Sequence, residues 1–331
     1  MVAAEQVGTL TRPGRAWSEP LAFAAMVLML AVLPVFVYPV FLMTALCFAL
    51  FACAFNLLLG YAGLMSFGHA MFFGMAGYFF GYVVKTLDMP PELGLLAGVL
   101  GAAALGLVTG ALAIRRQGIY FAMITLAFAQ MIYFFCVQAP FTGGEDGLQG
   151  IVRKPLLFGL IPTKDDRVLY YVVLAIFLFG YGAIYRFIHS PFGQVLKAIR
   201  DNEQRAVSLG YEADRYKLLA FVLSAALAGL AGATKAMVLQ FATLTDVSAA
   251  TSGEVVLMAL VGGLGTITGP VVGAFIIVTM QNYLASTGEF VLVIQGVIFV
   301  VIVMAFRKGL VGELTEWWKR RTAPRAAKAA D

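Results

Sequence analysis

The residues that could carry out chemistry are few, and most of them lie within apolar sequence. The two histidines, His69 and His189, are far apart in the chain. Cys47, Cys53 and Cys136 all lie in apolar runs, so they cannot build a disulfide framework or a metal cluster. No GxxxxGK[ST] phosphate loop, HExxH metal site or GxSxG nucleophile turn occurs. We therefore predict a chain without catalytic residues, without a metal site and without a cofactor.

Scattered polar residues inside the apolar runs indicate a different kind of site, a pathway. Polar groups at membrane depth usually face the interior of a helix bundle or a watery passage. Those beside a break in a helix have the alternative role of satisfying freed backbone groups. For Lys235 we expect an ammonium group that extends toward the outer surface. The candidates for the lining of a pathway are Asn56, Ser66, His69, Gln130 and Gln281.

The composition identifies the elements that must position these residues. Of the 331 residues, 61% are apolar and only 12% are charged. Repeated apolar runs of nearly twenty residues exceed what a soluble core would hide, so we predict an all-α polytopic membrane helical bundle of about ten spans. Segments 60–68 and 262–270 are candidates for broken helices. The expected spans are 21–38, 41–60, 66–84, 93–114, 118–138, 168–189, 217–239, 253–267, 269–286 and 289–306.

The basic residues predict the orientation of the bundle. If both termini are cytoplasmic, the inner loops and tail hold 17 of the 23 Lys and Arg residues, and the outer loops hold five. The positive-inside rule therefore favours cytoplasmic segments at 1–20 and 307–331 around a transmembrane domain at 21–306. This asymmetry also accounts for the net charge of +5, which otherwise suggests nucleic-acid binding; we expect no nucleic-acid partner.

Five spans precede the long outer loop at 139–167 and five follow it. Halves with an odd number of spans sit in opposite orientations, which is typical of inverted repeats. The glycine-rich segments 60–74 and 262–273 resemble each other, and both lie at a span break. A five-plus-five inverted repeat is therefore possible. In the outer loop, FTGGEDGLQGI at 141–151 is either a flexible turn or a docking surface for an external partner.

A charged amphipathic segment separates two apolar spans, at 190–211. Apolar residues recur there with helical spacing, which predicts one amphipathic helix from Phe192 to Gly210 at the cytoplasmic surface. Glu203 falls within the apolar stripe of that helix and needs a partner, because an unpaired carboxylate there would be costly. A helix that only rests on lipid is the alternative.

Five segments together resemble one known family, the M-type permease subunit of branched-chain amino-acid ABC importers. The resemblance extends over about residues 20–308, in the order of the family. Two departures are small: His189 stands where Arg is common, and Tyr211 stands where Ile is usual. The segments are FNLLLGYAGLMSFGHAMFFGMAGY (55–78), GIYFAMITLAFAQM (118–131), TGGEDGLQGI (142–151), SPFGQVLKAIRDNEQRAVSLGY (190–211) and GGLGTITGPVVGA (262–274).

This resemblance implies a permease of the type II importer architecture in a bacterial inner membrane. It implies a heterodimer with a second homologous permease, two cytoplasmic ATPase subunits that hydrolyse ATP, and a periplasmic substrate-binding protein. Segment 190–211 would then be the coupling segment, whose helix enters a groove in the ATPase, and the pathway would lie at the interface with the second permease. The coupling residues implied by the resemblance are Gly193, Ala198, Ile199, Arg200, Asp201, Asn202, Glu203, Ala206 and Gly210.

Three readings of the function remain open from the sequence. The first is import of branched-chain or related small hydrophobic amino acids. The second keeps the same machinery but carries urea, short amides or aromatic acids. The third is a carrier or channel that acts alone, against which stands the absence of a line of buried Asp, Glu or Arg residues across the spans.

Overall fold

A computed structural model describes residues 18–156, 163 and 165–284, and further on 293–294, 296–297, 299–300, 304 and 309–313. The chain divides into two compact units, Met1–Tyr38 and Pro39–Asp331. In the first unit, helix α1 (Ser18–Val32) continues into a short 3-10 turn, Leu33–Val35. Most of the predicted span at 289–306 and most of the two predicted terminal segments lie outside the described residues.

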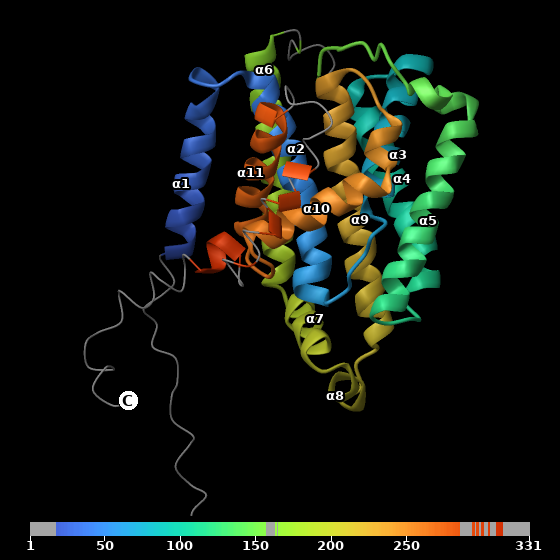
Figure 1. Ribbon diagram of the computed structural model, residues 1–331, viewed down its shortest axis with the longest axis vertical. Coiled ribbons are helices and arrows are strands. Elements are labelled where there is room, and N and C mark those ends of the chain that lie inside the picture. Colours follow the sequence, from blue (N-terminus) through green and yellow to red (C-terminus); the bar gives the residue numbers. More distant parts are fainter. Residues whose placement is uncertain are drawn as a thin grey trace, which may run out of the picture. The chain divides into compact units, whose positions relative to one another are not determined.

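The second unit is built from helices (Figure 1), and its described residues contain no strand, only one isolated bridge. The prediction of an all-α membrane protein is confirmed, because five helices are long and apolar enough to cross a membrane. The helices are α2 (Pro39–Asn56), α3 (His69–Gly81), α4 (Pro91–Ala113), α5 (Ile119–Gln138), α6 (Asp166–Ile188), α7 (Pro191–Asp201), α8 (Glu203–Ser208), α9 (Ala213–Leu239), α10 (Ala249–Gly262) and α11 (Gly269–Leu284).

Helix α2 is the central helix of this unit. Every residue from Ala45 to Asn56 is buried, as expected for a helix that is apolar on all sides. Beyond Asn56 the helix widens into a π-helical turn, Leu57–Ala62, which ends at Gly63 in the left-handed conformation (φ 72°). The predicted break at 60–68 is therefore a π-turn followed by a non-helical connection to α3.

Helices α3, α4 and α9 pack closely because small residues line their contacts. A Cβ atom on Gly232 of α9 would lie 1.8 Å from the carbonyl oxygen of Phe73 in α3. Similarly, a Cβ atom on Gly106 of α4 would lie 2.6 Å from the Cβ atom of Ala225 in α9. Membrane helices approach one another at such residues because lipid provides no hydrophobic drive for their association.

The described part of the outer loop is fixed to the end of α9. Leu148 and Ala242 exchange two backbone hydrogen bonds of 2.9 Å, and the Ile151 N–H donates to the Gln240 carbonyl at 2.9 Å. Lys154 pairs with Asp88 at 2.6 Å. The stretch 141–151 is therefore an anchored surface rather than a free turn, and it leaves the side chains of Glu145 and Asp146 exposed.

The two glycine-rich breaks lie at the same end of the unit and touch each other. A Cβ atom on Gly60 would lie 2.7 Å from the backbone nitrogen of Gly265, in the 263–268 turn between α10 and α11. In transporters built from inverted repeats, broken helices of the two halves often meet at the repeat interface. The five-plus-five repeat stays a prediction.

Candidate functional site

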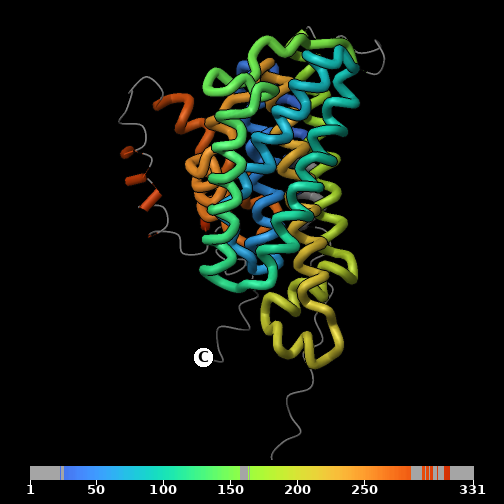
Figure 2. Tube along the Cα trace, turned by 90° about the vertical axis from the view of Figure 1, so that its right-hand side faces the viewer, coloured from blue at the N-terminus to red at the C-terminus, as the bar shows by residue number. Residues whose placement is uncertain are grey.

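The charged segment 190–211 forms two helices, α7 and α8, beyond the ends of the bundle helices (Figures 1 and 2). Ser190 caps α7 by accepting a hydrogen bond from the Gly193 N–H, and Pro191 occupies the first helical turn. Gly193 is needed where α7 folds back, because a Cβ atom there would lie 2.3 Å from the Ile188 carbonyl oxygen.

The prediction of one continuous helix from Phe192 to Gly210 is wrong. Asn202 adopts an extended conformation (φ −158°, ψ 97°), and its side chain caps α8 by accepting from the Arg205 N–H at 3.0 Å. Asn and Asp favour such positions because their side chains replace the missing backbone partners of a helix start. The break changes which residues share a face, so Glu203 begins a new helix and does not lie within the stripe of α7.

Apolar packing holds the two helices to α9. Ile199, Ala206 and Ala213 are buried together, with Val195 and Tyr216 against them. The structure thus brings Gly193, Ile199 and Ala206 inward, whereas Ala198, Asp201, Asn202 and Gly210 are exposed; Gly210 has a φ of 89°.

Glu203 has the partner that its position requires, and that partner belongs to the same chain. Its Oε1 atom lies 2.6 Å from Nζ of Lys217 in the first turns of α9. Its Oε2 atom accepts a hydrogen bond of 2.9 Å from the side-chain amide of Gln117. The Lys217 side chain is only 4% exposed, so this pair fastens α8 to the start of α9 and to the connection between α4 and α5.

Arg200 reaches inward to the π-turn at the end of α2. Its Nη1 atom donates a hydrogen bond of 2.5 Å to the Gly60 carbonyl oxygen, while Nε and Nη2 bind Oδ1 of Asp201 at 3.1 and 2.9 Å. Beside it, Nζ of Lys197 lies 5.5 Å from the ring centre of Tyr61. The cationic side chains of α7 therefore contact the membrane-embedded part of the same chain.

Asn56 joins the two breaks. Its amide nitrogen donates to the Thr266 carbonyl oxygen at 2.8 Å, and its Oδ1 atom accepts from the Gly265 N–H at 3.0 Å. The residue is 3% exposed. Asn56 therefore has the second of the two roles considered for a polar residue at a helix break. It supplies hydrogen-bond partners to backbone groups that no helix satisfies.

His69 and Ser66 are also fully buried inside the unit. Nε2 of His69 lies 2.7 Å from Oγ of Ser224, which donates at 2.5 Å to the Ala54 carbonyl oxygen, so the imidazole donates to the hydroxyl. Three rings, those of Phe55, Phe72 and Phe221, meet the imidazole edge-on. Ser66 accepts a hydrogen bond from the Gly68 N–H.

Gln130 of α5 and Gln281 of α11 are the pathway candidates that remain partly exposed. Gln281 lies beside Glu254, a partly exposed acid on α10. Glu254 is not among the predicted pathway residues, because it lies one residue inside the expected boundary of the span 253–267. An ionisable group within a membrane span is unusual, and this feature of the sequence could have identified it.

Lys235 differs from its prediction. Its ammonium group does not extend to the outer surface; it pairs with Asp246, and both side chains are nearly buried. The same ammonium lies 5.1 Å from the ring centre of Phe48 and 5.6 Å from that of Phe73. A buried charge is tolerated when it is paired, and here aromatic faces add to the stabilisation.

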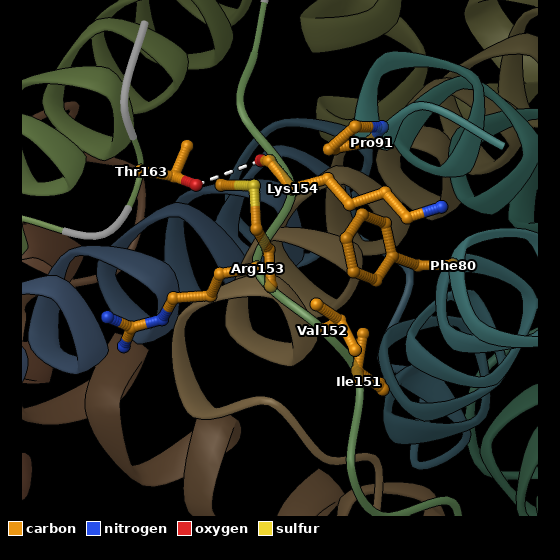
Figure 3. A pocket seen from close by; sticks show the side chains of 8 residues that line it. Phe80, Pro91, Ile151, Val152, Arg153, Lys154 and Thr163 are labelled. Atoms are coloured by element: carbon orange, nitrogen blue, oxygen red, sulfur yellow. Dashed lines mark hydrogen bonds between the residues drawn. The ribbon is translucent and has the colours of Figure 1, made fainter. Parts of the chain in front are cut away.

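A small pocket beneath the outer loop is lined by Phe80, Pro91 and residues 151–154 (Figure 3). Its volume of about 10 Å³ holds roughly one water molecule, so it is too small for an amino acid. The guanidinium of Arg153 points away from the pocket toward Asp166, which it binds at 2.6 Å. Among the described residues no cluster of His, Cys, Asp or Glu could hold a metal.

The second unit is a bundle of helices long and apolar enough to cross a membrane, with a charged pair of helices beyond their ends. The comparisons give the family: the model of the branched-chain amino acid transport system permease component matches residues 39–303, and the chain belongs to this family. No solved structure matches the chain.

Individual relatives agree with the family. The high-affinity branched-chain amino acid transport system permease protein LivM of Escherichia coli is 28% identical over 278 residues, 77% of this chain and 65% of the relative. A probable LivM of Methanocaldococcus jannaschii is 24% identical over 54% of this chain and 60% of the relative. The ribose import permease protein RbsC of Bacillus subtilis is 32% identical over 36% of this chain and 39% of the relative. The chain thus spans about 65% of the length of the E. coli LivM.

Proposed function

We propose that the chain is the membrane-spanning, non-catalytic permease subunit of an ATP-driven importer for branched-chain amino acids or related small hydrophobic amino acids. The observation that carries this proposal is the family match over residues 39–303. The likeness to LivM covers 77% of this chain, against 36% for the ribose permease, which favours amino acids over sugars as cargo.

The partners in this proposal are a second homologous permease, two ATPase subunits on the cytoplasmic side and a periplasmic binding protein, in a bacterial inner membrane. The α7–α8 end is then cytoplasmic, and segment 190–211 docks on an ATPase. Exposed apolar side chains at the tip support this docking: Val207 is 54% exposed, Leu209 71% and Tyr211 41%. Large apolar groups that protrude beyond a membrane bundle are typical of a protein interface.

Cargo passage is proposed for the surface that carries Glu254 and Gln281. The carboxylate of Glu254 can accept a hydrogen bond from the ammonium group of an amino acid, and the amide of Gln281 can donate one to its carboxylate. Asn56, Ser66 and His69 are enclosed by the chain's own helices, and we propose a supporting role for them at the breaks.

The test is uptake of labelled leucine by vesicles that contain the whole assembly. Uptake should require ATP, both ATPase subunits and the loaded binding protein. An excess of unlabelled valine or isoleucine should compete, whereas urea, short amides, aromatic acids and ribose should not. ATP-independent uptake by this chain alone would identify a stand-alone carrier, and competition only by another cargo class would reassign the substrate.

A further inference from the structure

Arg200 of α7 joins segment 190–211 to the backbone of the π-turn. We propose that Arg200 is a latch that keeps α7, the π-turn of α2 and the α10–α11 turn together as one moving body. This inference rests on the proposed function, because it assigns a route by which movement of segment 190–211 reaches the membrane. It also replaces the role in ATPase docking that the family resemblance implied for Arg200.

The first link is the hydrogen bond from Arg200 to Gly60. The carbonyl of Gly60 lies in the last turn of the π-helix, where carbonyl groups lack helical partners, and the guanidinium supplies a charged donor to it. The arginine stem passes directly over Gly63, where a Cβ atom would lie 2.8 Å from Cγ of Arg200. Only glycine leaves room for this crossing.

The acidic neighbour fixes the guanidinium in place. Asp201 accepts hydrogen bonds from both Nε and Nη2, which leaves Nη1 directed at Gly60. A planar guanidinium serves two acceptors at fixed angles in this way. Asp201 is 67% exposed, so its contribution is orientation of the arginine rather than burial of an ion pair.

The second link runs from the π-turn to the α10–α11 turn. Asn56 lies one turn before Gly60 and binds both Gly265 and Thr266, which are more than two hundred residues away in sequence. Thr266 in turn accepts a hydrogen bond of 3.1 Å from the Gly269 N–H at the start of α11. When α7 moves, these consecutive hydrogen bonds therefore transmit the movement to the end of α2 and to the start of α11.

The test compares two arginines at the same end of the bundle in the reconstituted assembly. Arg200→Gln removes the latch, and Arg116→Gln removes an exposed charge from the α4–α5 connection, outside segment 190–211, as the matched control. Arg200→Gln should keep the ATPase bound and hydrolysing, while leucine transported per ATP falls about five-fold or more. Arg116→Gln should keep the wild-type ratio. Arg200→Lys, which retains one donor for Gly60, should recover most of the loss.

Three results would overturn the latch. Arg200→Gln could transport as much leucine per ATP as Arg116→Gln, or it could release the ATPase in a pull-down, which would make Arg200 a docking residue. Arg200→Lys could also be as impaired as Arg200→Gln. If instead the wild-type assembly shows no ATP-driven uptake, the proposed function itself fails, and the two failures are thus distinguishable.

A distance measurement keeps the inference testable if Arg200→Gln assembles poorly. Spin labels on cysteines at Gln194 of α7 and at Leu264 of the turn report the separation, in a background without Cys47, Cys53 and Cys136. The wild-type distance should be the same in the nucleotide-free and nucleotide-trapped assemblies. Arg200→Lys should keep it constant. A wild-type distance that changes between these states would show that the contact opens, and would refute a permanent latch.

Discussion

Lys217 and Glu203 form a buried pair in which the two partners differ in burial, 4% against 26% exposed. Glu203→Gln strands the more buried charge, so it should lower the free energy of unfolding by about 3 kcal/mol. Lys217→Met leaves Glu203 closer to solvent and still bound to Gln117, so its cost should be smaller, about 1 kcal/mol. Denaturant unfolding of the detergent-solubilised chain measures both values.

The matched control is the exposed pair Arg215–Glu212, whose side chains are 79% and 60% exposed. Glu212→Gln should cost at most about 0.5 kcal/mol, because solvent screens the pair. The double variant Glu203→Gln with Lys217→Met should lose less free energy of unfolding than the two single variants lose together. Additive costs would mean that the two side chains do not interact in the folded chain.

Glu254 and Gln281 provide a prediction about the cargo surface. Glu254→Gln preserves size but removes the negative charge, and it should slow leucine uptake about ten-fold, the effect of losing one charge-assisted hydrogen bond. Gln281→Leu should also slow uptake while the assembly remains intact. His69→Leu should act differently and impair folding, because a branched aliphatic side chain loses the hydrogen bond to Ser224 and does not fit among the rings of Phe55, Phe72 and Phe221. Normal uptake by both surface variants would remove this surface from the pathway.

At the scale of the helices, close packing between α3 and α9 depends on Gly232. Gly232→Ala places a Cβ atom 1.8 Å from the Phe73 carbonyl oxygen, so the helices must separate at a cost of about 1–3 kcal/mol. Gly182→Ala on α6 is the control, since no atom lies within 4 Å of its added Cβ atom. It should be neutral or slightly stabilising. The measurement is the thermal unfolding midpoint of each variant in detergent. Equal midpoints for Gly232→Ala and Gly182→Ala would contradict the close approach of α3 and α9.

The exposed face of α7 gives a prediction on docking. Ala198 is exposed, so Ala198→Trp should leave the thermal midpoint of the isolated chain unchanged. The same change should weaken ATPase retention in a pull-down and lower stimulated hydrolysis, because an overpacked interface loses about 1–3 kcal/mol. Ala198→Ser should retain the ATPase. If the Trp variant binds and stimulates the ATPase normally, segment 190–211 rests on lipid instead.

The sequence predicted the helices well where apolar runs alone determine them. The expected span 118–138 coincides with α5 within a residue, since Gly118 and the turn after Gln138 end the apolar run on both sides. Helix breaks were harder to predict. Asn202 lies in a helical pattern of apolar residues, and only its capping geometry shows that α8 begins there. The π-turn at Leu57–Ala62 has no periodicity that distinguishes it from the α-helix before it.

The partners of the charged residues could not be predicted for a related reason. The pattern showed that Glu203 needs a counter-charge, but Lys217 and Gln117 become neighbours only when α4, α5 and α9 meet. Lys235 is similar, because Asp246 lies eleven residues away on a connection whose path depends on packing against α3. Long-range pairs of this kind follow from the tertiary fold, which the local pattern does not contain.

At the scale of the whole molecule, the two ends of the bundle differ in charge. The α7–α8 end carries exposed arginines such as Arg115, Arg116 and Arg205, whereas the basic residues of the other end are largely paired, as Lys154 is with Asp88. Lys and Arg residues are enriched in the cytoplasmic segments of membrane proteins. We therefore predict that α7 and α8 lie in the cytoplasm and that the loop containing Glu145 lies outside.

Single cysteines at two exposed positions test this orientation, in a chain whose three native cysteines are replaced. Glu145→Cys should react with an impermeant thiol reagent added to intact cells, because its loop is exposed at the outer end. Ser208→Cys, at the end of α8, should react only after the cells are opened. Cys136 retained alone is the control, since it is buried and should stay unlabelled under both conditions. Labelling of Ser208→Cys in intact cells would show that the orientation is the reverse of the predicted one. An ATPase could then not reach segment 190–211 from the cytoplasm.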